Sequence, residues 1–283
     1  MYKSVVSASI QKIEKDSVKI LDDDLAVEEP LEIQIGYKEN GISVTKNISV
    51  TMRTPGNDFE LAAGFLFTEG LISDPQNIKE IKYCSPLAKG AKARNEVLID
   101  LREGVKFDLS KLERHFYTSS SCGVCGKSSI HAVTVNNKFS SPKKTESGPF
   151  VSAETIYSLP DKLRSSQGLF ASTGGIHATG LFSASGELEL LKEDVGRHNA
   201  MDKMIGASLL AGKIPLSDHI GMVSGRASFE LLQKASLAGI PIVAAVGAPS
   251  SLALELAEEF NITLLGFVSQ SRFNIYHGGW RIK

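Results

Sequence analysis

The chain has 283 residues, of which 42% are hydrophobic and 22% are charged. These values are typical of a globular protein and exclude disorder, a collagen-like repeat or a coiled coil as the dominant state. The 31 basic and 32 acidic side chains give a formal net charge of −1, so there is no overall basic field that would attract nucleic acid. A chain of this length is typical of about two domains.

The sequence predicts a cytoplasmic protein without a membrane partner. No apolar run is long enough to span a bilayer, and polar side chains interrupt residues 1–16 too often for a signal peptide. The three cysteines are too few for a disulfide framework, which agrees with a reducing compartment.

The first half of the chain predicts a small α+β region. Residues 1–25 show no strong periodicity, but three later segments have the composition of strands, two of them alternating apolar and polar side chains. The expected strands are 31–35, 47–53 and 96–101. Between them, a helix is expected to begin at Asn57, with Glu60 three residues on, and to end at Gly70.

From residue 151 onward, strands alternate with helices of 10–15 residues, which predicts an α/β domain with a largely parallel sheet. The expected strands are 179–184, 187–194, 219–225, 240–247 and 262–269. The expected helices are 151–166, 197–212, 227–239 and 250–260. Pro160 is expected to break or kink the first of these helices, because proline cannot donate the internal hydrogen bond.

These patterns divide the chain into three parts. We predict an N-terminal α+β region at 1–115 and an α/β domain at 151–283. Residues 116–150 hold a Ser/Gly-rich loop, followed at 136–149 by a polar stretch with the character of a linker.

The sharpest local signal is the pair Cys122 and Cys125, a CxxC sequence in the Ser/Gly-rich loop. Backbone N–H groups in such a turn, together with Lys127, favour a thiolate, which is the nucleophilic form of cysteine. A thiolate attacks a disulfide or persulfide sulfur, so it is able to accept a sulfur atom and pass it on. Thiol chemistry is therefore the favoured interpretation.

Three other interpretations of the CxxC pair remain open: half of a zinc site, a dithiol redox site, and a chemically inert pair. The zinc interpretation needs four ligands, but no second CxxC is present. Cys84, His115 and His131 also show no recognisable ligand spacing. The CxxC spacing is also that of a dithiol redox site. The zinc deaminase signature, H-x-E followed by P-C-x-x-C, is absent from the sequence. We expect no metal, and we expect Cys84 to be an ordinary core thiol.

A second group of candidates follows the ends of the expected strands. Arg197, Arg226 and Arg272 each come shortly after a strand, and ligands bind outside the carboxyl ends of strands in such sheets. Arginine binds phosphate through two parallel hydrogen bonds, so three arginines at one edge favour a phosphate-bearing ligand over plain surface charges. Residues 170–177, with two glycines and His177, suit a polar ligand near a helix start or form a plain turn.

Six short motifs follow one another along the chain: RTPGNDFELAAGFLFTEGLI, SSSCGVCG, STGGIHATGLF, EDVGRHNAMDKMIG, SGRASFELLQKA and AVGAPSSLALELAEE. Because of these motifs in this order, the sequence from about Arg53 to Tyr276 resembles the FdhD family of formate dehydrogenase accessory sulfurtransferases. The family implies a three-layer fold similar to that of cytidine deaminases but without the zinc site, an added N-terminal region, and a homodimer.

The resemblance also implies a function. Members take persulfide sulfur from a cysteine desulfurase and pass it to the bis(molybdopterin guanine dinucleotide) form of the molybdenum cofactor, which then serves formate dehydrogenase. By position, Cys122 is the expected persulfide carrier and Cys125 its partner. His177, Arg197 and Arg226 match family motifs and are expected to contact the guanine-nucleotide-containing cofactor. The segment matching the family's cofactor-binding segment consists of Phe267, Val268, Ser269, Gln270, Ser271 and Arg272.

The sequence therefore predicts a sulfurtransferase. A non-catalytic chaperone that binds the molybdenum cofactor without carrying sulfur is the main alternative, and a dithiol oxidoreductase or zinc module is the third.

Overall fold

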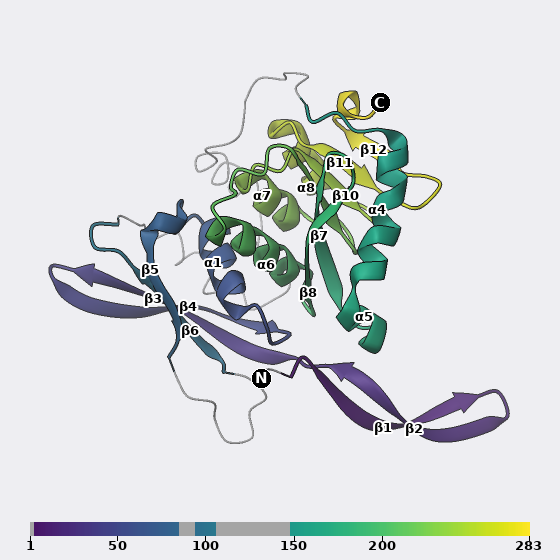
Figure 1. Cartoon of the computed structure of the whole chain (residues 1–283), viewed down its shortest axis with the longest axis horizontal. Helices are drawn as coiled ribbons and strands as arrows, with labels where there is room; N and C mark the ends of the chain where they lie inside the picture. Colours follow the sequence, from purple (N-terminus) through teal and green to yellow (C-terminus); the bar gives the residue numbers. More distant parts are fainter. Residues whose placement is uncertain (1–2, 85–93, 106–147) are drawn as a thin grey trace.

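The computed structural model describes residues 3–84, 94–105 and 148–283 (Figure 1). Cys122, Cys125, Lys127, His115 and His131 lie outside the described residues, so their predicted roles have no structural account here.

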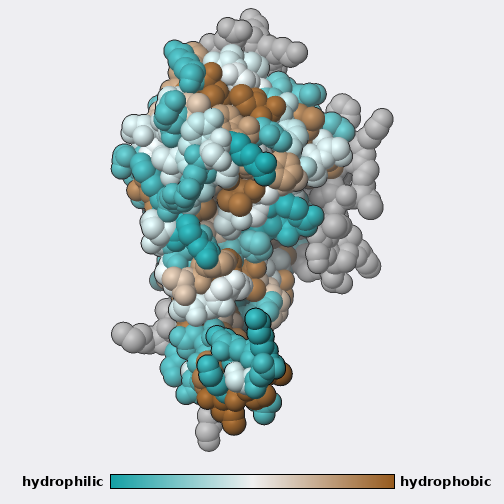
Figure 2. Space-filling view, turned by 90° about the vertical axis from the view of Figure 1, so that its right-hand side faces the viewer, coloured by the Kyte–Doolittle hydropathy of each residue, from teal (hydrophilic) through white to brown (hydrophobic). Residues whose placement is uncertain are grey.

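The chain begins with an antiparallel hairpin of β1 (Val5–Glu14) and β2 (Ser17–Ala26), which extends from the body of the molecule (Figure 1). Near its turn, Ile13, Val18 and Ile20 remain 64–76% exposed, and hydrophobic surface is visible on the hairpin at the bottom of Figure 2. The sequence predicted no element here, because the hairpin has no buried face to impose a clean alternation of apolar and polar residues.

A four-stranded sheet follows, in the order β4-β3-β6-β5. Its strands are β3 (Glu29–Glu39), β4 (Ile42–Arg53), β5 (Ile78–Tyr83) and β6 (Glu96–Leu101), and a short helix η1 (Pro75–Asn77) precedes β5. The three strands predicted in this region are confirmed, whereas β5 was not anticipated. Alternate residues of β3, including Leu31 and Ile33, are fully buried, so the sheet has one core face.

Helix α1 (Asp58–Thr68) packs on α6 (Arg197–Leu210) of the second half of the chain. Gly64 and Gly206 make this approach close, because a Cβ atom at either position would overlap with a backbone carbonyl oxygen of the opposite helix. The predicted start and end of α1 are confirmed, since Asn57 is its N-cap and Gly70 adopts a positive φ just after it.

The second sheet has six strands in the order β12-β11-β10-β9-β7-β8. They are β7 (His177–Ser183), β8 (Leu188–Asp194), β9 (His219–Val223), β10 (Ile242–Ala245), β11 (Thr263–Gly266) and β12 (Asn274–His277). The central strands β9, β10 and β11 are parallel, and the remaining strands pair antiparallel to their neighbours.

Helices cover both faces of this sheet, which gives three layers (Figure 1). One face packs on α6, α7 (Phe229–Leu237) and α8 (Ser251–Glu259), and their buried apolar side chains belong to a core that continues into the first sheet. The other face packs on α4 (Ala153–Ser166) through Ile156, Leu159 and Leu163. The predicted α/β class and three-layer arrangement are confirmed.

Two local expectations about this half were wrong. Pro160 does not break helix α4, which runs through it; the proline removes only one internal hydrogen bond from a helix anchored by three buried leucine and isoleucine side chains. Residues 170–177 do not precede a helix start; they contain the end of α5 (Gly168–Thr173) and lead directly into β7. Strand β12 and the terminal η2 (Gly279–Arg281) were not anticipated.

The domain boundaries at 115 and 150 stay a prediction, because the chain between 106 and 147 is outside the described ranges. Within the described residues, no helix combines the length and the hydropathy needed to cross a bilayer.

Candidate functional site

Three loops leave the carboxyl ends of the parallel strands and lie side by side. Backbone hydrogen bonds join them: Gly247 N–H donates to the Gly225 carbonyl at 3.0 Å, and Phe267 N–H donates to the Gly247 carbonyl at 3.1 Å. Residues 224–228, 246–250 and 267–272 therefore form a continuous rim, which we call the carboxyl edge. This is the position at which α/β sheets bind ligands.

His177 reaches the same edge from an antiparallel strand. It opens β7, whose pairing with β9 places its first residues beside the end of β9. Its ring lies close to Gly225, where an added Cβ would be 3.4 Å from ring atoms of His177. Burial, followed by the positive charges of Arg197 and His198, lowers the pKa of His177. His177 is thus an imidazole that stays neutral to lower pH than an ordinary histidine.

Arg197 and His198 open α6 at this edge. The Nε atom of Arg197 is buried and has no hydrogen-bond partner among the described residues. A buried guanidinium donor without a partner is rare in proteins, and it suits an anionic ligand at this position. The positive charge of Arg197 acts on the His177 ring, so the two side chains lie near each other. Their predicted contacts with the cofactor stay a prediction.

His198 is paired with two residues at the start of α7. Its Nε2 lies 2.8 Å from Oε2 of Glu230 and 3.2 Å from Oγ of Ser228. The hydrogen bond from His198 is the main cause that lowers the pKa of Glu230. The sequence does not predict the pairing of His198 with Glu230, because the two residues are far apart in the chain and form no local motif.

A buried ion pair fixes the segment that carries Arg197 and His198. Asp194, which has no exposed surface, lies 2.6 Å from Nζ of Lys203 and accepts hydrogen bonds from the backbone N–H groups of Thr54 and Gly196. Lys203 also donates to the Thr54 carbonyl at 2.9 Å. The end of β4 is thereby tied to the beginning of α6.

Arg226 is exposed, and its side-chain stem lies over Gly247, where an added Cβ would be 3.0 Å from its Cγ. Phe267 is 42% exposed and adopts a φ of 53°, an unusual conformation for a bulky residue. Such outliers cluster at functional sites. The rim therefore presents a cation and an aromatic ring to solvent.

The segment Ser269–Arg272 forms a closed turn, in which the Ser269 hydroxyl and the Arg272 backbone bond to each other. The amide of Gln270 donates to both carboxylate oxygens of Asp161, on α4. Gln270 is thus held toward the α4 face, whereas Arg197 and His198 belong to the α6 face. The cofactor contacts predicted for residues 269–272 stay a prediction.

The expectation that Cys84 is a core thiol was wrong, because Cys84 is exposed at the end of β5, with its sulfur 3.5 Å from Oε1 of Gln34. Partial burial of the sulfur, followed by the charges of Glu96 and Glu32, raises the pKa of the Cys84 thiol. No group of three or more potential metal ligands occurs in the part of the chain that the structure describes.

We expect Cys84 to be a slow nucleophile despite its exposure, since a raised pKa leaves less thiolate at neutral pH. In a Cys122→Ser/Cys125→Ser variant, iodoacetamide at pH 7.5 should alkylate Cys84 more slowly than it alkylates free glutathione, as followed by intact mass. An equal or faster rate would contradict the raised pKa.

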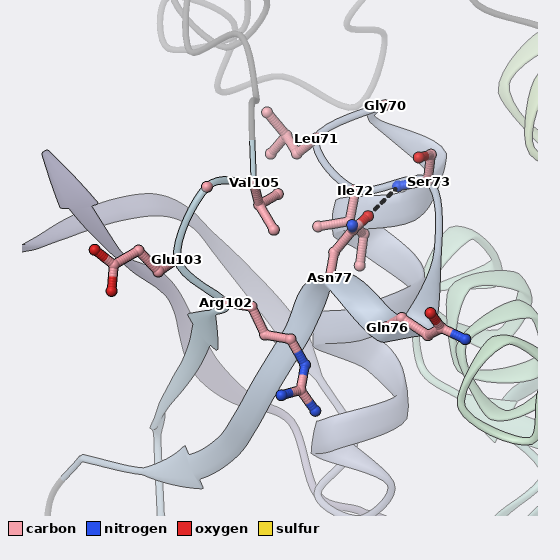
Figure 3. Close-up of a pocket in the computed structure, with 10 residues that line it drawn as sticks. Gly70, Leu71, Ile72, Ser73, Gln76, Asn77, Arg102, Glu103 and Val105 are labelled. Atoms are coloured by element: carbon pink, nitrogen blue, oxygen red, sulfur yellow. Dashed lines mark hydrogen bonds between the residues drawn. The ribbon is translucent and has the colours of Figure 1, made fainter.

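A separate hollow of about 520 Å³ lies in the N-terminal part (Figure 3). It is lined by 70–73, 76–77 and 102–105. Its ionisable residues are Arg102 and Glu103, and the Glu103 carboxylate is 2.9 Å from Nζ of Lys38. It contains neither the clustered cations nor the histidines found at the carboxyl edge.

Comparison with known proteins shows which family the chain belongs to. The model of the FdhD/NarQ family matches residues 26–283. The chain belongs to the FdhD/NarQ family. The resemblance inferred from the six motifs is therefore confirmed.

Relatives named sulfur carrier protein FdhD match over almost the full chain. One from Streptomyces coelicolor is 46% identical over 272 residues, covering 96% of this chain and 93% of the relative. One from Mycolicibacterium paratuberculosis is 49% identical over 259 residues and covers 91% of each chain. An archaeal one, from Sulfurisphaera tokodaii, is 40% identical and covers 96% of each.

A crystal structure from Desulfotalea psychrophila, described as that of a formate dehydrogenase accessory protein, has the same fold. Its TM-score is 0.74 at 24% sequence identity, and the match covers 99% of this chain and all of the other. The fold described above is thus shared with that solved structure.

Proposed function

We propose that this protein is a sulfur carrier that accepts persulfide sulfur from a cysteine desulfurase and delivers it to a molybdenum cofactor for formate dehydrogenase. The observation that carries the proposal is the membership in a family with relatives named sulfur carrier proteins, one of which is 49% identical to this chain. The CxxC pair of this chain supplies the thiol chemistry that such a role requires.

Cys122 is the proposed carrier. Its thiolate attacks the terminal sulfur of the desulfurase persulfide, the S–S bond of that persulfide breaks, and the desulfurase leaves as a thiolate. Cys122 then holds the transferred sulfur as its own persulfide, with no net oxidation or reduction in the exchange. Cys125 is positioned in the sequence to resolve or relay this sulfur. In this role the protein is a sulfurtransferase with a covalent intermediate.

The carboxyl edge is the proposed binding site for the cofactor, the bis(molybdopterin guanine dinucleotide) form, which is the acceptor substrate. Its residues suit the diphosphate groups. Arg197 has a buried donor without a hydrogen-bond partner among the described residues, and the exposed Arg226 lies on the neighbouring loop. His177 adds a neutral imidazole, which contacts the ligand. Phe267–Arg272 completes the proposed site. We propose a cytoplasmic homodimer as the working form.

The test is the intact mass of purified protein after incubation with a cysteine desulfurase and cysteine. We expect one extra sulfur atom on the wild type, removed by reductant and absent from Cys122→Ala, because the carrier thiolate is then missing. Cys84→Ala is the matched control and should load like the wild type, since the pKa of Cys84 is raised. Loading of Cys122→Ala to the wild-type level would overturn the assignment.

A cofactor chaperone without sulfur chemistry is the second candidate, because the carboxyl edge alone would suffice for it. It predicts guanosine diphosphate binding by a protein that acquires no sulfur in any variant. Metal content and reversible oxidation of Cys122 and Cys125, measured on the same preparation, test the zinc and dithiol alternatives.

A further inference from the structure

The segment that follows β11 lies against helix α4 at one end of the carboxyl edge (Figure 1). Two apolar contacts anchor it there. Val268 is 2% exposed and belongs to the same buried cluster as Ile156 of α4. The ring of Phe273 packs on the ring of Tyr157, also on α4, at a centroid distance of 5.3 Å. Because burial of apolar surface dominates such contacts, they place the segment on α4 independently of the polar residues between them.

The polar contact between the same two elements is exposed to solvent. Asp161 lies one helical turn after Tyr157, and its Oδ1 and Oδ2 atoms accept hydrogen bonds from Nε2 of Gln270 at 2.9 and 2.7 Å. Both side chains are exposed. An exposed hydrogen bond adds little net free energy, because water replaces either partner. A ligand that offers better donors is therefore able to take the place of Gln270.

The two oxygens of this carboxylate match one edge of guanine. Guanine presents two adjacent donors, N1–H and the N2 amino group, and a carboxylate accepts both through two parallel hydrogen bonds. Adenine, cytosine and uracil present no such pair of neighbouring donors. Gln270 serves both oxygens of Asp161 with a single nitrogen, which is a poorer geometry than two parallel bonds.

The charges along the carboxyl edge orient a nucleotide in one direction. The negative charge of Asp161 repels a diphosphate, whereas Arg226, exposed on the loop after β9, attracts it. One strand separates β9 from β11, so the ends of these two strands are about 10 Å apart. This separation suits a nucleotide whose base lies at α4 and whose diphosphate lies over the middle of the edge.

We propose that Asp161 recognises the guanine base of the cofactor by accepting N1–H and the N2 amino group in place of Gln270. Asp161 is then a specificity-determining residue, and Gln270 is the internal partner that the base displaces. This inference rests on the proposed function, because the ligand is the guanine-nucleotide part of the cofactor bound at the carboxyl edge.

The probes are guanosine, inosine and xanthosine diphosphate, titrated into the full-length protein by calorimetry. Inosine lacks the N2 amino group, and xanthosine has a carbonyl oxygen in its place. We expect the wild type to bind guanosine diphosphate about tenfold more tightly than inosine diphosphate, because inosine forms one fewer hydrogen bond to a charged group. Xanthosine diphosphate should bind more weakly still, since its carbonyl oxygen faces the carboxylate.

Asp161→Asn should reverse this preference. The asparagine amide offers one acceptor and one donor, which match the N1–H and the neighbouring carbonyl oxygen of xanthine. The variant should therefore bind xanthosine diphosphate about tenfold more tightly than guanosine diphosphate. A change that only loosened the segment from α4 would weaken all three nucleotides by the same factor, so a purely structural role does not produce the reversal.

Two further variants serve as controls. Glu154→Gln removes another exposed carboxylate of α4 and should keep the wild-type order of affinities. Gln270→Ala should bind guanosine diphosphate about threefold more tightly, since the exposed hydrogen bond to Asp161 no longer has to be broken. Weaker binding by Gln270→Ala would show that Gln270 contacts the ligand, and would overturn the exchange. Thermal melting of each variant checks that the fold is retained.

The outcomes separate the inference from the function on which it rests. Equal binding of guanosine and inosine diphosphate by the wild type, or uniform weakening in Asp161→Asn, would overturn base recognition by Asp161 while the cofactor site stands. If the wild type binds none of the three nucleotides, the proposed cofactor site fails as well, whereas sulfur loading on Cys122 remains separately measurable.

Discussion

Replacement of Gly64 by alanine is expected to lower the free energy of unfolding by about 3 kcal/mol, the upper range for overpacking of a well-packed interface. The added methyl group would overlap with the Asp202 carbonyl oxygen and come within 2.9 Å of the Gly206 nitrogen. Both are backbone atoms of α6, so no side-chain rotation relieves the contact. Helices α1 and α6 would have to separate, and the core that joins the two sheets would be opened.

The measurement is equilibrium unfolding in denaturant by circular dichroism. Helix propensity alone predicts that alanine stabilises the middle of α1 by about 1 kcal/mol, so the sign of the change tests the packing directly. Gly168→Ala is the matched control, because an added Cβ there meets no atom within 4 Å. If Gly64→Ala were as stable as the wild type, the close packing of α1 on α6 would be disproved.

Elements whose side chains are buried were predictable from the sequence, and exposed elements were not. Strands β9, β10 and β11 are short apolar runs between glycine and serine turns, because helices cover both of their faces, and all three were found from sequence. The β1–β2 hairpin was missed for the opposite reason, since most of its side chains face solvent. Pro160 misled the prediction for α4, where tertiary packing outweighs the loss of one hydrogen bond.

The candidate site was predictable only where it coincides with strand ends. His177, Arg197 and Arg226 directly follow or begin elements with clear patterns, and the structure brings them to one edge. Glu230 has no such signal, because a carboxylate in the first turn of a helix is common for reasons of helix stability alone. Its contact with His198 arises from the packing of α6 on α7. Local sequence patterns do not encode such tertiary pairs.

We expect the second large loss of folding free energy from the replacement of Asp194 by alanine. Asp194→Ala leaves the ammonium group of Lys203, which is 1% exposed, without its carboxylate, and such changes cost about 3–5 kcal/mol of folding free energy. Adding Lys203→Met removes the unpaired charge while keeping an apolar side chain of similar length. The double variant should therefore recover more than half of the lost stability in the same denaturant measurement.

Binding separates the two roles of this ion pair. Asp194 also accepts the backbone N–H groups of Gly196 and Thr54, and these bonds hold the segment that presents Arg197 and His198. Because methionine at position 203 does not replace them, the double variant should stay about tenfold weaker for guanosine diphosphate, as expected for a loss of charge-assisted contacts. Full recovery of binding together with stability would mean that Asp194 serves only to neutralise Lys203. Recovery of stability alone would show that the same carboxylate supports the fold and orients the carboxyl edge.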